Sequence, residues 1–365
     1  MVAALGLGVP LASATGTLTG TATAVGANNY GQLGDTTTDP SLERVPVAVP
    51  PAIAIASGRD HGYALDEQHR VRAWGKNDKG QVGDGTLTNR PTPVLLSLSD
   101  VVEIEAGHYH GIALTADGRV WTWGFGRLGQ LGLGTTSNRR VPTQVPGLSG
   151  IVRVVAGRDA SYAIAAGGTV YAWGSNVLGE VGDGTRTRRL RPVSVPGLSG
   201  VVEMAAGRNH ALALTAQGAL WAWGANDYGQ VGDGTRQLRT SPVLVLGSGI
   251  AHVDAGAHHS IAVRTNGTVL TWGRGYRGQL GTGGTGNRTR PGAVSGLPTI
   301  VEVGDGRDQS FAITATGEAW AWGHNSAGQL GDGTTARRLR PVHLAASAVA
   351  VIQGGALHTV FLINQ

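Results

Sequence analysis

An all-β fold built from one repeated unit is predicted by three observations. The pair Trp-Gly recurs with spacings of 49 or 50 residues, and Val25-Gly26 stands at the same spacing before the first pair. Each interval contains short β-rich runs without a helical period. Turn signals rich in Gly, Asp and Asn separate these runs. A fixed period of about 50 residues is typical of repeat architectures. The tryptophans of the pairs are Trp74, Trp123, Trp173, Trp223, Trp272 and Trp322.

One repeat contains four predicted strands. Val101–Ala106 is a short β-rich run, and His110–Thr115 alternates small and large apolar residues. Asp117-Gly118 is a hairpin turn signal before a further alternating run, Arg119–Trp123. A Gly-rich loop leads to a fourth run around Val141–Val145. Each repeat is therefore expected to form an antiparallel four-stranded blade, with strands A to D in chain order.

The two ends of the chain each carry half a repeat. Ala350–Gln365 predicts strands A and B and stops where the hairpin turn is expected. Gly20–Asp35 begins at that turn and supplies strands C and D. The halves complete one blade when the ends of the chain meet. We therefore predict a seven-bladed β-propeller closed by strands from both termini, as one domain over residues 20–365.

Composition narrows the class of protein. The 60 glycines and 15 prolines fall at fixed repeat positions, so they mark turns. The absence of cysteine excludes disulfides, thiolate zinc sites and cysteine nucleophiles. The formal net charge is +5, and of 29 basic residues all but Lys76 and Lys79 are arginine. Two explanations stay open: the base composition of the genome, or bidentate recognition of carboxylate or phosphate.

The N-terminal segment, residues 1–19, is apolar. It begins MVAALGLGVPLASA and has the Ala-Ser-Ala pattern of a signal-peptide cleavage site without a positively charged start. We expect the remnant of a secretion signal and a secreted protein; the alternative is an N-terminal arm on a cytoplasmic one. No run of 18 apolar residues occurs, so no membrane span is expected.

The full repeat motif, AG-x-x-H-[SGA]-x-A-L-T-x-x-G-x-[VL]-x-x-W-G-x-N-x-x-G-Q-[LV]-G-D-G-T, resembles the regulator-of-chromosome-condensation repeat family, in a bacterial-type form. The resemblance covers about residues 20–365 and implies a propeller. One branch of that family catalyses guanine-nucleotide exchange on a small GTPase and docks on chromatin. Another comprises secreted bacterial inhibitors of β-lactamases. This chain lacks the basic N-terminal tail and long insertions of the first branch, and its loops are less aromatic than those of the second.

The repeated polar residues are expected to be structural. One histidine per blade lies too far from its next copy to share a metal ion, so we predict that it hydrogen-bonds the loop between strands A and B. Each Gly-Asp-Gly-Thr loop offers one carboxylate, too few for calcium, so the aspartate is predicted to cap its own turn. The tryptophans are expected to pack between blades. The histidines are His61, His110, His210, His259 and His358, and the aspartates are Asp84, Asp183, Asp233 and Asp332.

Deviations from the repeat indicate where function lies. In an antiparallel blade the A–B and C–D loops emerge on the same side, and here they are rich in Arg, Tyr, Asn and His. We predict a non-catalytic interaction module that binds a protein partner, expected to be acidic, through this loop face. The predicted partner-binding residues are Arg59, Asp60, His108, Tyr109, Arg158, Asp159, Arg208, Asn209, Asp227, Tyr228, His258, Arg274, Tyr276, Arg277, Arg307 and Asp308.

Alternative functions remain at this stage. They are nucleotide exchange on a small GTPase, inhibition of a secreted enzyme, and a carbohydrate-active propeller, which would need an acidic pair in its central channel. No catalytic motif, cofactor motif or metal-ligand set is found, so we predict neither an enzyme nor a cofactor. We do not expect the protein to bind nucleic acid, and we expect it to be a monomer.

A second set of arginines precedes strand D. Strand D is the outermost strand, so these residues are expected on the rim of the disc. They either protect an edge strand from pairing with other sheets or contact an acidic protein or a nucleic acid. The set consists of Arg139, Arg140, Arg186, Arg188, Arg189, Arg191, Arg236, Arg239, Arg288, Arg290, Arg337, Arg338 and Arg340.

Overall fold

The structure is a computed structural model that describes residues 19–364 of the chain. The predicted signal remnant lies outside the described residues, apart from Thr19. Residues 19–364 form twenty-eight strands and no helix. The strands are β1 (Gly20–Gly26), β2 (Ser41–Pro46), β3 (Ala52–Ser57), β4 (His61–Asp66), β5 (Val71–Gly75), β6 (Arg90–Leu95), β7 (Val101–Ala106), β8 (His110–Thr115), β9 (Val120–Gly124), β10 (Arg139–Gln144), β11 (Ile151–Ala156), β12 (Ala160–Ala165), β13 (Val170–Gly174), β14 (Arg189–Ser194), β15 (Val201–Ala206), β16 (His210–Thr215), β17 (Leu220–Gly224), β18 (Arg239–Leu246), β19 (Ile250–Ala255), β20 (His259–Arg264), β21 (Val269–Gly273), β22 (Arg288–Ala293), β23 (Glu302–Asp305), β24 (Gln309–Ile313), β25 (Ala319–Gly323), β26 (Arg338–His343), β27 (Val349–Gly354) and β28 (His358–Asn364).

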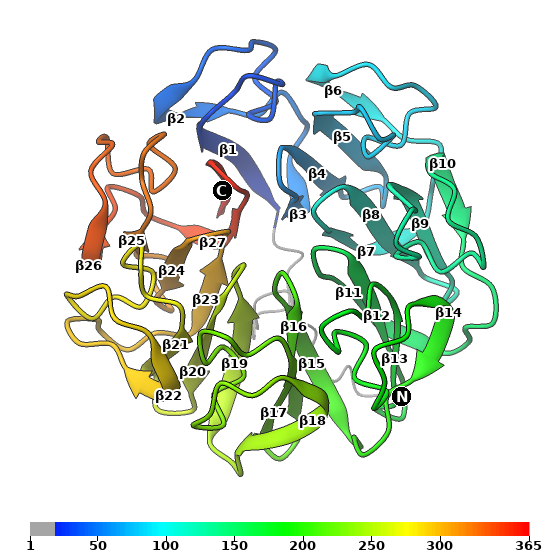
Figure 1. The fold of residues 1–365 in the computed structure, drawn as a ribbon. Helices are drawn as coiled ribbons and strands as arrows, with labels where there is room; N and C mark the ends of the chain where they lie inside the picture. The colour runs from blue at the N-terminus through cyan, green and yellow to red at the C-terminus, as the bar shows by residue number, and fades with distance from the viewer. Residues whose placement is uncertain (1–18, 365) are drawn as a thin grey trace, which may run out of the picture.

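The strands pair antiparallel in groups of four, which we call blades, arranged around a common axis (Figure 1). Separate sheets hold β7–β10, β11–β14, β15–β18, β19–β22 and β23–β26. A larger sheet joins β3–β6 to β27, β28, β1 and β2 through the single residue pair Gly20–Ala52. The all-β architecture of repeated four-stranded antiparallel sheets is therefore confirmed.

Strands from the two ends of the chain lie in one sheet. β1 pairs with β28 over its whole length, from Gly20 opposite Asn364 to Gly26 opposite His358. β27 pairs with the other edge of β28, and β2 with the other edge of β1. These four strands occupy the A, B, C and D positions of a blade, in the order that the two half-repeats predict.

Burial is greatest in the second strand of a blade and least in the fourth strand at the rim. All six residues of the second strand β16 are buried. The fourth strand of a neighbouring blade, β14, has no buried residue and exposes Arg191 and Ser194. The difference arises because a middle strand is covered on both faces by neighbouring blades, whereas an outer strand borders solvent.

The repeated tryptophans join neighbouring blades, as predicted. Trp223 of β17 is fully buried and packs in one cluster with Tyr162 and Val170 of the preceding blade. Its indole Nε1 donates to the carbonyl oxygen of Glu180 in that blade's C–D loop, at 2.8 Å. The other five members make the equivalent bond, namely Trp74 to Gln32, Trp123 to Gln81, Trp173 to Gln130, Trp272 to Gln230 and Trp322 to Gln279.

The glycine after each tryptophan is required by the backbone. Gly224 has a φ of 99°, a conformation that other residues rarely adopt. A Cβ atom there would lie 2.3 Å from the carbonyl oxygen of Asn209 in the A–B loop. The recurring Trp-Gly pair therefore combines one contact between blades with one close approach within a blade.

The repeated histidines also join blades, and the prediction that they bond the A–B loop is wrong. His210 Nε2 lies 2.9 Å from Ser260 Oγ on the second strand of the next blade. The ring packs so closely on Gly207 that a Cβ there would be 2.3 Å from His210 Cε1, and this packing directs Nε2 toward the neighbour. Ser260 Oγ in turn donates to Gln230 O at 2.9 Å. The equivalent contacts are His110–Ser161 and His259–Ser310, and His358 instead contacts Ser57 at the end of the next blade's first strand.

A four-residue clamp holds the C–D loop. Asn226 Nδ2 donates to Asp233 Oδ1 at 3.2 Å, and Asn226 Oδ1 accepts the Val231 N–H at 3.0 Å. Asp233 also accepts from Thr235 Oγ1 at 2.8 Å and from Arg239 Nε at 2.7 Å. The predicted turn-capping role of the aspartate is confirmed. The same clamp surrounds Asp84, Asp183 and Asp332.

The clamp accounts for part of the predicted rim set. Arg189, Arg239 and Arg338 are the arginines of three clamps. Others cover a glycine of the preceding blade: a Cβ on Gly234 would lie 2.4 Å from Arg290 Nη2, and Arg191 and Arg340 occupy equivalent places. These arginines stabilise loops and blade contacts. For the rest of the set, the contact with a partner stays a prediction.

Candidate functional site: the loop face at the mouth of the central channel

A central channel runs between the first strands of the blades. It encloses a cavity of about 440 Å³ lined by residues from β3, β7, β11, β15, β19, β23 and β27. The A–B loops, which follow these strands, surround one end of the channel, which we call the mouth. Four of the lining side chains there are arginines: Arg59, Arg158, Arg208 and Arg307.

The A–B loops form a hydrogen-bonded collar around the mouth. The backbone N–H of Arg158 donates to Gly207 O at 3.2 Å, that of Arg208 to Ala257 O at 3.1 Å, and that of Ala257 to Arg307 O at 3.0 Å. Because successive loops hold one another, the side chains of the mouth project from a fixed frame, which lowers the entropy cost of binding a partner. Further bonds of the collar are His108 to Arg158, Arg307 to Gly355 and Ala356 to Arg59.

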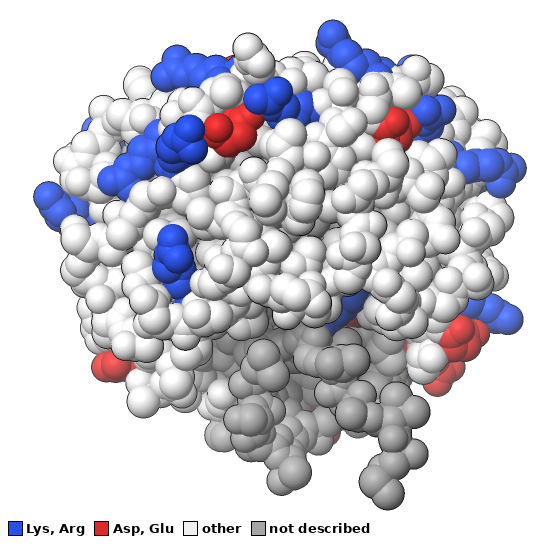
Figure 2. Space-filling model, turned by 90° about the horizontal axis from the view of Figure 1, so that it is seen from below, with Lys and Arg blue, Asp and Glu red and all other residues white. Residues whose placement is uncertain are grey.

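The C–D loops stand beside this collar. The Ala225 N–H donates to Asn209 O at 2.8 Å, and the equivalent bond recurs at Arg274–His258 and Lys76–Asp60. The prediction that both loop sets emerge on one side is therefore confirmed. Lys and Arg side chains gather toward the side of the molecule that faces the viewer in Figure 1, as Figure 2 shows.

The predicted partner-binding residues all belong to these loops but differ in exposure. The exposed ones are Arg208, Asp227, Tyr276, Arg277 and Arg307. The half-buried ones are Arg59, His108, Tyr109, Arg158, Asn209, Tyr228, His258 and Arg274. The buried ones are Asp60, Asp159 and Asp308. The exposed part of the set is therefore three arginines, one tyrosine and one aspartate, whereas the aspartates of the A–B loops are buried.

The buried aspartates hold arginines in place. Three A–B loops read Arg-Asp, and in each the guanidinium lies against the carboxylate of the residue that follows it. The N–O distances are 3.2 Å for Arg59–Asp60, 3.1 Å for Arg158–Asp159 and 3.7 Å for Arg307–Asp308.

Aromatic rings and cations alternate across two adjacent C–D loops. The Arg274 guanidinium lies 5.2 Å from the ring centroid of Tyr228 and 5.5 Å from that of Tyr276. Arg277 lies 5.6 Å from the Tyr276 centroid. Tyr228 also meets His258 edge-on, at 5.3 Å between centroids. Such cation–π contacts hold long side chains in defined positions without neutralising their charge.

The positive charge of the mouth comes from arginine and not from histidine. Burial, followed by the charges of Arg208 and Arg274, lowers the pKa of His258 to about 4. Burial and the neighbouring arginines, first among them Arg158, also hold the pKa of His108 far below its usual range. Both imidazoles are therefore neutral at pH 7.

Below the mouth, the channel wall carries a belt of alternating charge. Glu103 accepts from Arg153 Nη1 at 3.2 Å and from the Val154 N–H of the next blade at 2.8 Å. Glu203 likewise accepts the next blade's Val253 N–H at 2.9 Å and lies 3.3 Å from an imidazole nitrogen, Nδ1 of His252. The inner strand of each blade is an edge strand with free N–H groups, and these carboxylates satisfy them.

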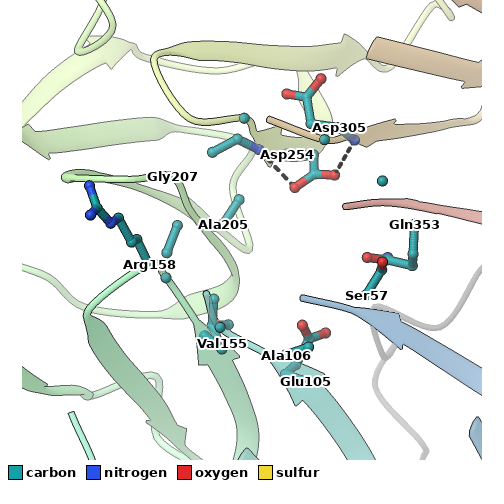
Figure 3. A pocket seen from close by; sticks show the side chains of 18 of the residues that line it. Ser57, Glu105, Ala106, Val155, Arg158, Ala205, Gly207, Asp254, Asp305 and Gln353 are labelled. Atoms are coloured by element: carbon teal, nitrogen blue, oxygen red, sulfur yellow. Dashed lines mark hydrogen bonds between the residues drawn. The ribbon is translucent and has the colours of Figure 1, made fainter. Parts of the chain in front are cut away.

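A second level of carboxylates lies closer to the mouth. Glu105 and Asp254 reach into the channel from different walls (Figure 3). Asp254 accepts the N–H groups of Ala255, at 2.7 Å, and of Asp305 in the next blade, at 2.8 Å. Burial raises the pKa of Glu105 to about 8 and that of Asp254 to about 7, and nearby carboxylates add to both shifts. Glu302 below them is raised to about 7, again chiefly by burial.

Family comparison supplies the identity of the repeat. The regulator of chromosome condensation (RCC1) repeat matches residues 68–114, 117–164, 167–214, 217–263, 266–313 and 316–362. The chain belongs to the RCC1 repeat family. A second description of the same repeat matches shorter segments between residues 52 and 279. A comparison with curated protein sequences finds no match.

Solved structures share the fold of this RCC1-repeat chain. Prp20p from Saccharomyces cerevisiae, studied for its binding to Gsp1p and histones, has a TM-score of 0.86 and 24% identity over 96% of this chain and 93% of its own. Yeast RCC1 (Prp20) in its complex with Kap60 has a TM-score of 0.86 and 22% identity over 100% and 95%. Human WBSCR16 has 0.84 and 22% over 95% and 99%. At these identities the likeness establishes the fold alone.

Sequence reasoning missed the channel residues of this RCC1-repeat chain. Glu103 and Glu203 share the third position of strand A, Glu302 occupies the same place in its repeat at the start of β23, and Glu105 and Asp254 share the fifth position. A charge at alternate positions of an otherwise apolar strand is a signal that one face meets solvent or a channel. Residues 19–364 bring together no three His, Asp or Glu side chains able to hold a metal ion, and contain no helix able to cross a membrane.

Proposed function

We propose that this RCC1-repeat chain is a non-catalytic interaction module that binds a protein partner through its A–B and C–D loops. One observation carries the proposal: the repeated side chains hold the blades together, whereas the residues that vary gather at the mouth of the channel. Arginine and tyrosine dominate that variable set, and both are enriched in the residues that carry binding energy at protein interfaces. An acidic partner fits a mouth from which the carboxylates are turned inward.

The proposal includes a ring of seven blades closed by both termini. The pairing of β1 with β28 supports closure, as does the collar bond from the Ala356 N–H to Arg59 O at 3.1 Å. It also includes secretion and a monomeric state, which the apolar start of the sequence and the basic surface favour. Mass measurement of the natural protein in the medium, with its N-terminal sequence, tests both.

Site-specific cross-linking tests the binding face. A photoreactive amino acid at Tyr276, which is 58% exposed, should capture a partner from culture supernatant or lysate. The same group at Ser199, an exposed residue in the loop between β14 and β15, is the matched control and should capture no partner. Tyr228→Ala with Arg274→Ala should abolish the capture at unchanged melting temperature. Capture from Ser199 alone would contradict the proposal.

The channel carboxylates bear on the carbohydrate-active alternative. An acidic pair in the channel is its requirement, and Glu105 and Asp254 both face the cavity. The bonds from Asp254 to the backbone of two adjacent blades favour a structural role for that carboxylate. The alternative would be established if the protein hydrolysed a polysaccharide and Glu105→Gln abolished that hydrolysis. Nucleotide exchange rests on the shared fold, and accelerated nucleotide release from a small GTPase would establish that function.

A further inference from the structure

Two blades make contrasting contacts between the A–B loop and the preceding blade. In both, the second residue of the loop bonds to the second residue of the preceding blade's Gly-Gln-x-Gly or Gly-Glu-x-Gly segment. In one of them, Gln279 Nε2 donates to Asp308 Oδ1 at 3.2 Å. At the equivalent place Glu180 replaces the glutamine and Asn209 replaces the aspartate, and Asn209 Nδ2 donates to Glu180 Oε1 at 2.7 Å. Both pairs form one hydrogen bond, but the donor lies in the preceding blade at Gln279–Asp308 and in the A–B loop at Asn209–Glu180.

This exchange moves a negative charge away from the mouth. Glu180 is 2% exposed, and its carboxylate also accepts the Leu178 N–H at 2.7 Å and Ser175 Oγ at 3.2 Å. The charge therefore resides in a buried loop. Arg208, which precedes Asn209, loses the adjacent carboxylate that the other three mouth arginines have.

Arg208 is the arginine of the mouth best placed to bind an anion. It is exposed, and its contact among the described residues is with the neutral ring of His258, at 3.4 Å between Nη1 and Nε2. Burial lowers the pKa of Arg208, and the positive charges of Arg158 and Arg307 add to the shift. Like charges converge there without full neutralisation, so an incoming carboxylate gains charge-assisted hydrogen bonds.

The surroundings favour a peptide carboxylate over a polyanion. His258, which Arg208 contacts, meets the ring of Tyr228 edge-on, and Arg274 lies over that ring, which gives an aromatic surface suited to peptide side chains. Deeper in the channel, Glu105 and Asp254 present carboxyl groups, which offer no positive charge to a chain of many phosphates. One short acidic segment lying across the mouth fits both features.

We propose that Arg208 binds a carboxylate of an acidic segment in the partner protein, at a site created by the exchange of Gln and Asp for Glu180 and Asn209. This inference rests on the proposed function. It specifies which of four mouth arginines recognises the partner and what chemistry it recognises.

Fluorescence anisotropy with a labelled hexaglutamate peptide tests the inference on the full chain. Hexaglutamine is the uncharged control. Arg208→Gln should weaken hexaglutamate binding about tenfold or more, the size expected from losing one charge-assisted hydrogen bond. The double variant Glu180→Gln with Asn209→Asp should weaken it to the same extent. This variant restores the contact seen at Gln279–Asp308 and keeps the net charge.

The controls separate this site from general attraction to a basic protein. Arg236→Gln removes one exposed arginine outside the mouth and should leave the affinity within about twofold. Unchanged hexaglutamate binding in the double variant would overturn the inference, as would equal loss in Arg236→Gln. Competition by inorganic phosphate stronger than by acetate at equal ionic strength would also overturn it, because the site would then select phosphate.

The failure of the inference and of the proposed function can be told apart. A partner still captured from Tyr276 by the double variant would refute the role of Arg208 and leave the loop face intact. A partner captured from Ser199 and not from Tyr276 would refute the loop face itself.

Discussion

Two arginines of one blade show how the framework and the mouth differ. Arg239 donates to Asp233 within the C–D loop clamp, with side chains 30% and 9% exposed. Arg208 is exposed, has no adjacent carboxylate and contacts a neutral imidazole. The same residue type thus stabilises a loop in one place and, in the other, is the group that we propose binds a partner. In this repeat protein, an arginine that lacks an adjacent carboxylate therefore marks the candidate functional site.

The largest effect is expected in the framework, from Trp223→Ala. The indole is fully buried between two blades and donates to Glu180 O. Its removal leaves a cavity and takes one of two donors from the Glu180 carbonyl, which still accepts from Tyr162, so the free energy of unfolding should fall by about 3–5 kcal/mol. Chemical denaturation measures this change. A loss as small as that of a surface substitution would contradict the assignment of the tryptophans to contacts between blades.

Breaking the clamp should have the next largest effect. Asp233→Ala removes the acceptor for Asn226, Thr235 and Arg239 together. The expected loss of stability is about 1–3 kcal/mol, because partly buried donors are left without a partner. Arg236→Ala, an exposed arginine three residues away, is the matched control and should change stability by less than about 0.5 kcal/mol. Equal effects would remove the distinction between clamped and exposed arginines.

The channel carboxylates should make stability depend on pH. Burial raises the pKa of Glu105 to about 8 and that of Asp254 to about 7, so the folded chain binds more protons than the unfolded chain between these values and about pH 4. Their contribution is fully present below the unfolded pKa and is lost as pH rises through the folded pKa. Buried histidines such as His210, with a pKa lowered to about 3, act in the opposite direction below about pH 6.5.

A difference measurement isolates the carboxylate contribution. Glu105→Gln carries no titrating group at this position, and histidine terms cancel between the variant and the wild type. The variant should gain stability relative to the wild type as pH rises from about 5 to about 9. Denaturation curves at several pH values check this. A constant difference between the two proteins would show that Glu105 is ionised in the folded channel throughout.

The smallest stability effect is expected at the mouth. Arg208→Ala should change the free energy of unfolding by less than about 0.5 kcal/mol, because the side chain is exposed and has no ion pair beside it. Thermal unfolding in the absence of any partner measures this. A large destabilisation would place Arg208 in the framework and leave the mouth without its distinguishing residue.

The repeat made the framework predictable from sequence. Trp223 and Asp233 recur at one spacing, and recurrence alone indicates packing and turn capping. The direction of His210 was not predictable, because its partner Ser260 lies 50 residues away in the next blade. The exchange at Glu180 and Asn209 was likewise hidden: Glu180 departs from the repeat motif, but nothing in the sequence shows that it faces Asn209.

The loop face was predicted as a set, but not the roles within it. Asp60 and Asp308 look like exposed loop residues in the sequence, yet the collar of A–B loops buries both. The channel carboxylates, such as Glu105, were not predicted. Whether a strand residue faces the channel depends on how the blades surround the axis, which the sequence does not show. Burial and partner identity both come from contacts between blades, which one repeat does not encode.

One comparison tests the central claim most directly: the affinity of the folded Arg239→Gln variant for hexaglutamate against that of the Arg208→Gln variant. Both variants lose one positive charge from the same blade. The account predicts that Arg239→Gln binds the peptide as the wild type does and unfolds more easily, whereas Arg208→Gln binds about tenfold more weakly at unchanged stability. Equal loss of affinity in both variants would contradict it, because binding would then follow net charge and not the mouth of the channel.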